Sequence, residues 1–166
     1  MIYPHQELKD DFDISAYFYN PNIHPSSEHN QRLDSLKSYC LENKIDLITR
    51  DYDPHEYFAK IGSQTGPDQR CRHCYELRLS ETARMAKENG FESISTTLLV
   101  STYQQHELIK EIGITVADRA GLTFEYRDYR EGFNYGRTMS KTLGMYQQSY
   151  CGCLFSEHDG YVRRRN

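Results

Sequence analysis

The hydrophobic positions of this chain follow two periods, and each period predicts a different kind of element. Residues 13–19 (DISAYFY) alternate between polar and aromatic or aliphatic side chains, which predicts a strand. Further strands are predicted over residues 45–50, 91–97 and 122–127. Helical spacing predicts helices over about residues 28–43, 55–61, 72–89 and 104–120. A further helix is expected to begin after residues 129–133 and to end near Gly144. Residues 3–8 are expected to form the last turns of another helix.

Strands that alternate with helices predict an α/β fold, a three-layer sandwich around a mostly parallel sheet. The chain has 166 residues, which suits a single domain over residues 1–166 with a core large enough to fold unaided. In such sheets, ligands bind at the carboxyl ends of the strands. The loops after the first and third predicted strands, FYNPNIHP and TTLLVS, are therefore candidate site segments.

The helix over residues 28–43 carries more detailed expectations. Ser26 or Ser27 is expected to cap its N-terminus. The positions expected on its inner face are Leu33, Leu36 and Leu41. Cys40 lies on the same apolar side, so we interpret it as a small core residue rather than a functional thiol.

Composition narrows the class of protein. The formal net charge is −4, so bulk electrostatics gives no support to nucleic-acid binding. No apolar run approaches the length of a membrane span, and no signal peptide is evident, so the expected location is the cytoplasm. Disulfides are rare there, and clustered cysteines are more often ligands or catalysts than structural cross-links.

Two cysteine pairs carry the candidate chemistry. Cys71 and Cys74 are expected at the start of the helix over residues 72–89, where two thiols three apart can bind one metal or cluster and the helix N-terminus favours thiolate. Cys151 and Cys153 flank one glycine, a spacing that permits a tight chelate or a strained, readily reduced disulfide. From the residues alone, a metal site, a dithiol couple and a structural four-cysteine zinc site all remain open.

The sequence lacks other common catalytic and nucleotide-binding motifs. The sequence has no P-loop, no Gly-x-Gly-x-x-Gly after a strand and no Gly-x-Ser-x-Gly elbow. The histidines show no His-x-x-x-His helix pair, and those near the expected site are His24, His73 and His106. For each of them, an exposed or hydrogen-bonded histidine is the commoner interpretation.

Four stretches, in order along nearly the whole chain, resemble the QueH-type epoxyqueuosine reductases. They are residues 18–25 (FYNPNIHP), 71–79 (CRHCYELRL), 96–101 (TTLLVS) and 150–156 (YCGCLFS). The resemblance implies a nucleotide-hydrolase-like α/β sandwich. It also implies an enzyme that removes the epoxide oxygen of epoxyqueuosine in tRNA by two-electron reduction, giving queuosine.

The resemblance also implies roles for individual residues. Cys71 and Cys74 would be ligands of a 4Fe-4S cluster, and Cys151 and Cys153 a redox-active pair or ligands of a second iron. The expected partners are tRNA that carries epoxyqueuosine and an unidentified electron donor. The residues expected to line the substrate end of the site are Tyr19, Asn20 and Asn22, with Arg78 and Arg137 as candidate phosphate contacts.

One departure from the family pattern changes the expectation for this chain. Family members begin with a strand that carries a His-x-Cys-Cys-Ala-Pro-type motif, whose adjacent thiols supply further cluster ligands, and no Cys-Cys pair exists here. We therefore expect an N-terminally incomplete copy, without its first strand, that holds a cluster poorly or not at all. Two alternatives stay open: a non-catalytic α/β module closed by a structural zinc site, and a metal-free thiol–disulfide oxidoreductase.

Overall fold

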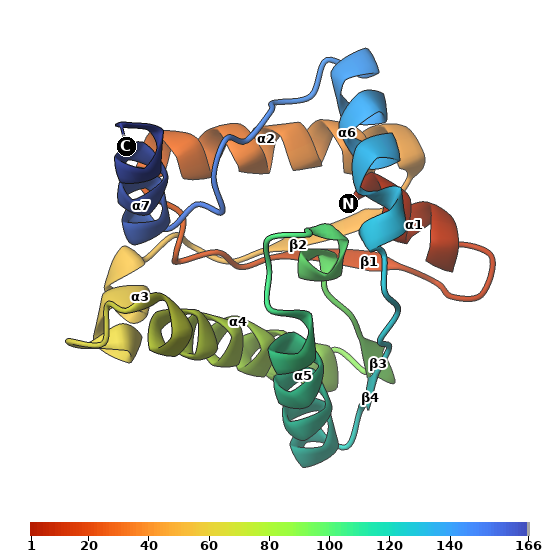
Figure 1. Ribbon diagram of the computed structural model, residues 1–166. Helices are drawn as coiled ribbons and strands as arrows, with labels where there is room; N and C mark the ends of the chain where they lie inside the picture. The colour runs from red at the N-terminus through yellow and green to blue at the C-terminus, as the bar shows by residue number, and fades with distance from the viewer. Residues whose placement is uncertain (166) are drawn as a thin grey trace. The chain divides into compact units, whose positions relative to one another are not determined.

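A computed structural model describes residues 1–165 of the chain, with side chains through residue 160 (Figure 1). The chain folds into two compact units. The first unit combines Met1–Ile14 with Tyr75–Leu143, and the second combines Ser15–Cys74 with the segment from Gly144 onward. Each unit contains one pair of parallel strands with helices around it, so the predicted α/β class with parallel pairing is confirmed.

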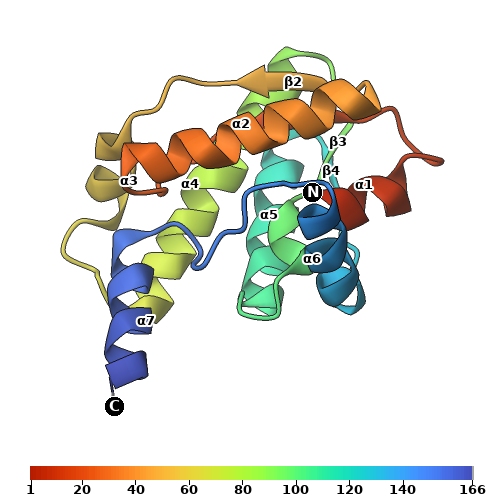
Figure 2. The same cartoon turned by 90° about the horizontal axis from the view of Figure 1, so that it is seen from above.

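The second unit is built on strands β1 (Ser15–Phe18) and β2 (Asp46–Thr49), which pair in parallel from Ser15↔Asp46 to Phe18↔Thr49. Helix α2 (Ser26–Asn43) runs along this pair (Figure 2). Every second residue of β1 is buried, as the alternation in the sequence predicts. Helix α2 ends where Lys44 adopts the left-handed conformation, and the chain turns back there into β2.

Two shorter helices and part of a long one complete the second unit. Helix α3 (Pro54–Ile61) has Pro54 in its first turn, and the side chain of Asp53 caps it by accepting a hydrogen bond from the His55 N–H at 2.9 Å. Helix α4 (Pro67–Glu88) contributes its N-terminal part to this unit, and helix α7 (Leu154–Arg165) follows the second cysteine pair. The sequence patterns did not predict α7.

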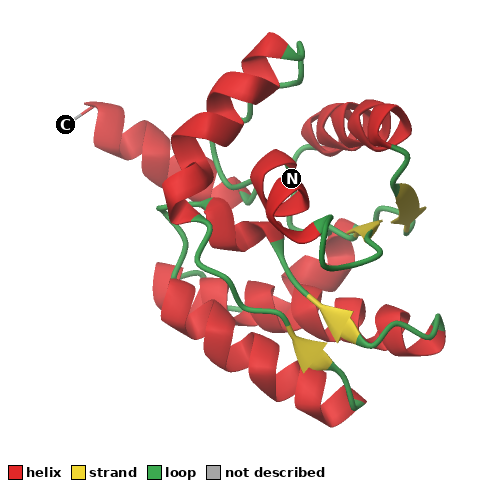
Figure 3. Ribbon diagram, turned by 90° about the vertical axis from the view of Figure 1, so that its right-hand side faces the viewer, coloured by secondary structure: helices red, strands yellow, loops and turns green. Residues whose placement is uncertain are grey.

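The first unit contains two very short strands, β3 (Ser93–Ile94) and β4 (Thr123–Phe124), paired in parallel (Figure 3). The helices of this unit, besides the remainder of α4, are α1 (Ile2–Leu8), the 3₁₀ turn η1 (Thr97–Val100), α5 (His106–Ala120), the 3₁₀ turn η2 (Arg130–Gly132) and α6 (Phe133–Thr142). Each lies within a few residues of its prediction, except that Thr97–Val100, expected as the end of a strand and a loop, is helical.

Two glycines of the first unit allow close packing. A Cβ atom at Gly113 of α5 would lie 2.4 Å from the Phe124 ring, so β4 can approach α5 only where this side chain is absent. A Cβ atom at Gly132 would lie 2.0 Å from the Tyr3 ring, which joins α1 to the turn before α6.

The apolar face of α5 carries Ile109, Ile112 and Val116 at helical spacing, and all three are buried.

Several local predictions were wrong. Leu41 is 83% exposed, and the buried positions of α2 near it are Tyr39 and Cys40, so the inner face of this helix was placed incorrectly. Neither Ser26 nor Ser27 caps α2, whose N-cap position is Pro25. The four strands are shorter than predicted and form two separate pairs. None of the helices within the described part of the chain is long and apolar enough to cross a membrane.

Candidate active site

The loop that follows β1 forms one side of the candidate site in the second unit. The Tyr19 hydroxyl donates to Glu56 at 2.5 Å, and the guanidinium of Arg50 lies 5.1 Å from the Tyr19 ring centroid. The Tyr19 side chain is therefore held by its own neighbours. Asn20 is half-buried and Asn22 is buried, so the three residues predicted to line the substrate end lie on one loop but differ in exposure.

The turn that carries the second cysteine pair is fastened to this loop. The His24 N–H donates to the Gly152 carbonyl at 2.8 Å, and the Tyr150 hydroxyl donates to the His24 carbonyl. Gly152 has a φ of +113°, and a Cβ atom there would lie 2.8 Å from Cγ1 of Ile23. A glycine is thus required between the two thiols, because only glycine adopts this backbone conformation without strain and leaves room for Ile23.

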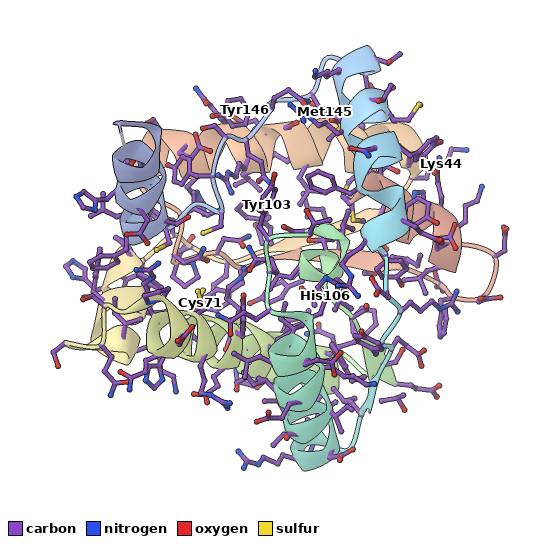
Figure 4. The ribbon with its side chains drawn as sticks, in the orientation of Figure 1. Lys44, Cys71, Tyr103, His106, Met145 and Tyr146 are labelled. Atoms are coloured by element: carbon purple, nitrogen blue, oxygen red, sulfur yellow. The ribbon has the colours of Figure 1, made fainter. Side chains whose placement is uncertain are left out.

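Arg32 on α2 holds the same turn from another direction. Its Nη1 donates to the Cys151 carbonyl at 3.1 Å and its Nη2 donates to the Tyr150 carbonyl at 3.0 Å. The guanidinium also pairs with the Glu28 carboxylate at 2.7 Å. Tyr146 lies beside α2 (Figure 4) and donates its hydroxyl to the same carboxylate at 2.5 Å. A buried ion pair therefore fixes the conformation of the turn that carries the two thiols.

Cys71 and Cys74 lie on α4, as predicted, but not at its start. The helix begins at Pro67, so Cys71 (Figure 4) is in its second turn and the expected stabilisation of thiolate by the helix N-terminus is weaker than we assumed. The neighbouring cation is Arg70, which is buried and donates to the Thr65 carbonyl at 2.6 Å and to the Asp159 carboxylate at 3.0 Å. Burial raises the pKa of the Cys71 thiol, and the Arg70 guanidinium opposes this effect in part.

The structure brings these four thiols near enough to influence one another, with Tyr57 beside Cys153 and Cys74. The Tyr57 hydroxyl, on a fully buried ring, donates to Sγ of Cys153 at 3.1 Å. Burial raises the pKa of Tyr57, and the nearby thiols of Cys153 and Cys74 raise it further. Cys151 in turn contributes to the raised pKa of Cys71. Residues 80 positions apart along the chain thus act on one another's protonation.

The electrostatics of the site favour thiols over thiolates. The pKa of Cys153 is raised first by its hydrogen bond with Cys151 and then by burial, while the hydroxyl of Tyr57 opposes both effects. Cys153 is buried and Cys151 is exposed, so one member of the pair is protected and the other can be reached from solvent. Cys40 is confirmed as a buried core residue.

The thiols do not form a ready site for a single metal ion. Among the described residues, no three His, Cys, Asp or Glu side chains converge closely enough to hold one. The donor chemistry nevertheless suits iron and sulfide, because Cys71 and Cys74 are soft ligands on one helix with the cation of Arg70 beside them. They can supply two of the four thiolates that a 4Fe-4S cluster usually takes.

The other candidate residues have different surroundings. A ring nitrogen of His73 lies 2.6 Å from Oε1 of Gln64, and Nε2 of His106 lies 3.2 Å from the Ser101 carbonyl. Arg78 and Arg137 belong to the first unit, and their proposed contact with phosphate stays a prediction.

Sequence reasoning missed four residues that shape this site. These are Glu28, Arg32, Tyr57 and Arg70. The i,i+4 spacing of Glu28 and Arg32 is a visible signal for an ion pair, but nothing in the sequence connects that pair to a turn some 118 residues away.

These features define an α/β protein whose second unit gathers four thiols beside a buried arginine and a buried tyrosine. The family model described as epoxyqueuosine reductase QueH matches residues 1–159. The chain therefore belongs to the epoxyqueuosine reductase QueH family, and the resemblance drawn from its motifs is confirmed. Since the family is named for a reductase, the prediction of an oxidoreductase is confirmed as well.

Individual relatives agree with this assignment. An epoxyqueuosine reductase QueH of Dehalococcoides mccartyi is 37% identical over 151 residues, which cover 90% of this chain and 82% of the relative. One of Thermotoga maritima is 34% identical over 155 residues, with 87% and 79% covered. One of Acinetobacter baylyi is 36% identical over 154 residues, with 89% and 70% covered.

Proposed function

We propose that this chain reduces epoxyqueuosine in tRNA to queuosine, with Cys151 and Cys153 as the source of the electron pair. The observation that carries the proposal is the proximity of the Cys151–Cys153 turn to Cys71 and Cys74, with Tyr57 beside Cys153 and Cys74. Membership of the epoxyqueuosine reductase QueH family supports the substrate, and two thiols of unequal exposure with one glycine between them support the reaction type.

The reaction balances with a dithiol as the reductant. Joining two thiols into a disulfide releases two electrons and two protons. The epoxide takes up both: its two C–O bonds break, a carbon–carbon double bond forms between the former epoxide carbons, and the oxygen leaves as water. An external dithiol, small or protein-borne, then reduces the Cys151–Cys153 disulfide and completes the cycle.

The surroundings of the two thiols suit this sequence of events. Cys153 is buried beside the Tyr57 hydroxyl, which can stabilise negative charge on its sulfur as a hydrogen-bond donor. Cys151 is exposed and can be reached by the external dithiol. Arg32 and Gly152 hold the backbone of the turn that carries both thiols.

A 4Fe-4S cluster, where one is bound, would be held in part by Cys71 and Cys74. The cluster, and a second iron nearby, would each supply one-electron transfer and a Lewis-acidic iron. Binding of iron requires both thiols to lose their protons. Burial raises the pKa of Cys71, and Arg70 assists the loss of the proton because its cation opposes that effect. The family pattern takes further ligands from a Cys-Cys pair that this sequence does not contain.

The proposal is tested with the full chain, purified without oxygen and incubated with tRNA that carries epoxyqueuosine and with dithiothreitol. Nucleosides released from the tRNA are separated and identified by mass. We expect queuosine from the unsubstituted protein and from Cys40→Ala, which removes a buried thiol outside the site. We expect at least a hundredfold slower formation with Cys151→Ser or Cys153→Ser.

Three results would count against the proposal. Full activity of either serine variant would remove the dithiol from the reaction. Disulfide exchange on a general substrate that survives chelation, without any queuosine, would favour a thiol–disulfide oxidoreductase. One tightly bound zinc per chain, again without queuosine, would favour a structural zinc module.

A further inference from the structure

Two buried side chains on the loop after β1 lack the partners that buried polar groups normally have. Asn22 is 2% exposed and His24 is 8% exposed. Within the described residues, Oδ1 of Asn22 and both ring nitrogens of His24 have no hydrogen-bond partner. Unpartnered buried polar groups cost stability, so three such atoms on one loop call for an explanation, and functional sites are where proteins retain such groups.

The loop lies next to the thiols. The His24 ring centroid is 4.8 Å from that of Phe58 and 5.4 Å from that of Tyr57. The hydroxyl of the same Tyr57 donates to Sγ of Cys153, and the His24 backbone is bonded to Gly152. The unpartnered atoms and the redox pair are thus joined through one tyrosine ring and one main-chain hydrogen bond.

The chemistry of these atoms selects an uncharged ligand. Burial lowers the pKa of His24, so the imidazole is neutral at pH 7, with one N–H donor and one acceptor nitrogen. The Asn22 carbonyl oxygen is a further neutral acceptor. These three atoms carry no charge, so a phosphate or carboxylate gains no ion pair from them, whereas a ring that carries hydroxyl groups can donate to the acceptors and accept from the imidazole N–H.

We propose that Asn22 and His24 bind the uncharged, oxygen-bearing ring of the substrate beside Cys153, and we call this pair the ring site. This inference rests on the proposed function, since the oxygen-bearing ring is the ring of epoxyqueuosine that carries the epoxide and the neighbouring hydroxyl groups. It assigns His24 a binding role in its neutral form and no proton transfer.

The test measures binding and stability separately, with the nucleoside epoxyqueuosine as the probe. Binding is measured by calorimetry in the Cys151→Ser background, so that no turnover occurs, and the Tm of each protein is measured without ligand. We expect His24→Phe and Asn22→Leu each to raise the Kd at least tenfold while the Tm stays unchanged or rises, because each variant removes unpartnered polar atoms from a buried position.

The matched control is His29→Phe, which alters another buried histidine on α2 that packs against Tyr52 with ring centroids 4.2 Å apart. The Kd of the His29→Phe variant for the nucleoside should equal that of the parent Cys151→Ser protein. A second control is inorganic phosphate, which should not raise the Tm of the parent at concentrations where the nucleoside does.

Three results would overturn the ring site: no binding of the nucleoside by the parent, an unchanged Kd in both His24→Phe and Asn22→Leu, or a Tm that falls together with affinity in both. The last result would indicate a structural role. The outcomes also separate this inference from the proposed function. Binding that depends on His24 without any reduction would refute the reaction and leave the ring site, whereas reduction with a Kd independent of His24 would refute the ring site alone.

Discussion

The buried ion pair of Arg32 and Glu28 offers the strongest single test of how the thiol turn is held. Replacing Arg32 with Met keeps an unbranched apolar stem but removes the guanidinium group and its charge. The Arg32 and Glu28 side chains are only 10% and 9% exposed, so the substitution leaves a buried carboxylate without its cation. It also removes the hydrogen bonds to the carbonyls of Tyr150 and Cys151.

The expected loss of stability follows from this burial. Breaking one side of a buried ion pair typically costs about 3–5 kcal/mol, which for a chain of this size lowers the Tm by roughly 6–20 °C. The free energy of unfolding is measured by urea titration of the reduced protein, followed by circular dichroism. The double variant Arg32→Met with Glu28→Gln should recover about 1–3 kcal/mol of the loss, because it removes the stranded charge.

The matched control lies on the same helix. Lys37 pairs with Asp34 at 3.2 Å, but the two side chains are 55% and 72% exposed. Lys37→Met should therefore change the free energy of unfolding by at most about 0.5 kcal/mol. If Arg32→Met unfolds at the same urea concentration as Lys37→Met, the ion pair does not hold the turn and the reasoning fails.

Three further predictions concern other parts of the chain. Gly152→Ala should destabilise the protein by about 1–3 kcal/mol in urea titration, because its φ is +113° and a Cβ would lie 2.8 Å from Ile23, whereas Gly136→Ala in α6 should be neutral or stabilising. Ile109→Ala should cost about 2–5 kcal/mol by the same assay, since the side chain is fully buried, and a cost below 1 kcal/mol would contradict the packing. Burial lowers the pKa of His29, so the unfolded chain binds a proton first and stability should fall as pH drops below about 6.5, by at most about 1.4 kcal/mol per pH unit; His29→Phe should flatten this slope, and an unchanged slope would refute it.

Much of the fold is visible in the sequence because it depends on local periodicity. The alternation in β1 and the Ile109, Ile112 and Val116 face of α5 each predict the element that forms. The start of α4 could also have been placed correctly, since Gly66 precedes a proline and an aspartate in the first turn. The exposed Leu41 was misplaced because helical spacing alone does not say which of two adjacent apolar residues packs inward.

The residues of the candidate site likewise include some that the sequence predicts and some that it does not. The four thiols could be picked out because cysteine pairs at short spacing are rare and chemically distinctive. Tyr57 and Arg32 could not, since their contacts are with a sulfur and two main-chain carbonyls that are 96, 118 and 119 positions away. Every residue type has a main-chain carbonyl, so no sequence motif predicts a contact with one.

The central claim is that Cys151 and Cys153 supply the electron pair for reduction of the epoxide. The most direct measurement is a single turnover with fully reduced protein and no external reductant, in which thiols are trapped in acid and nucleosides are quantified from the same sample. The account predicts one Cys151–Cys153 disulfide for each queuosine formed. Queuosine that accumulates while both thiols remain reduced would contradict it.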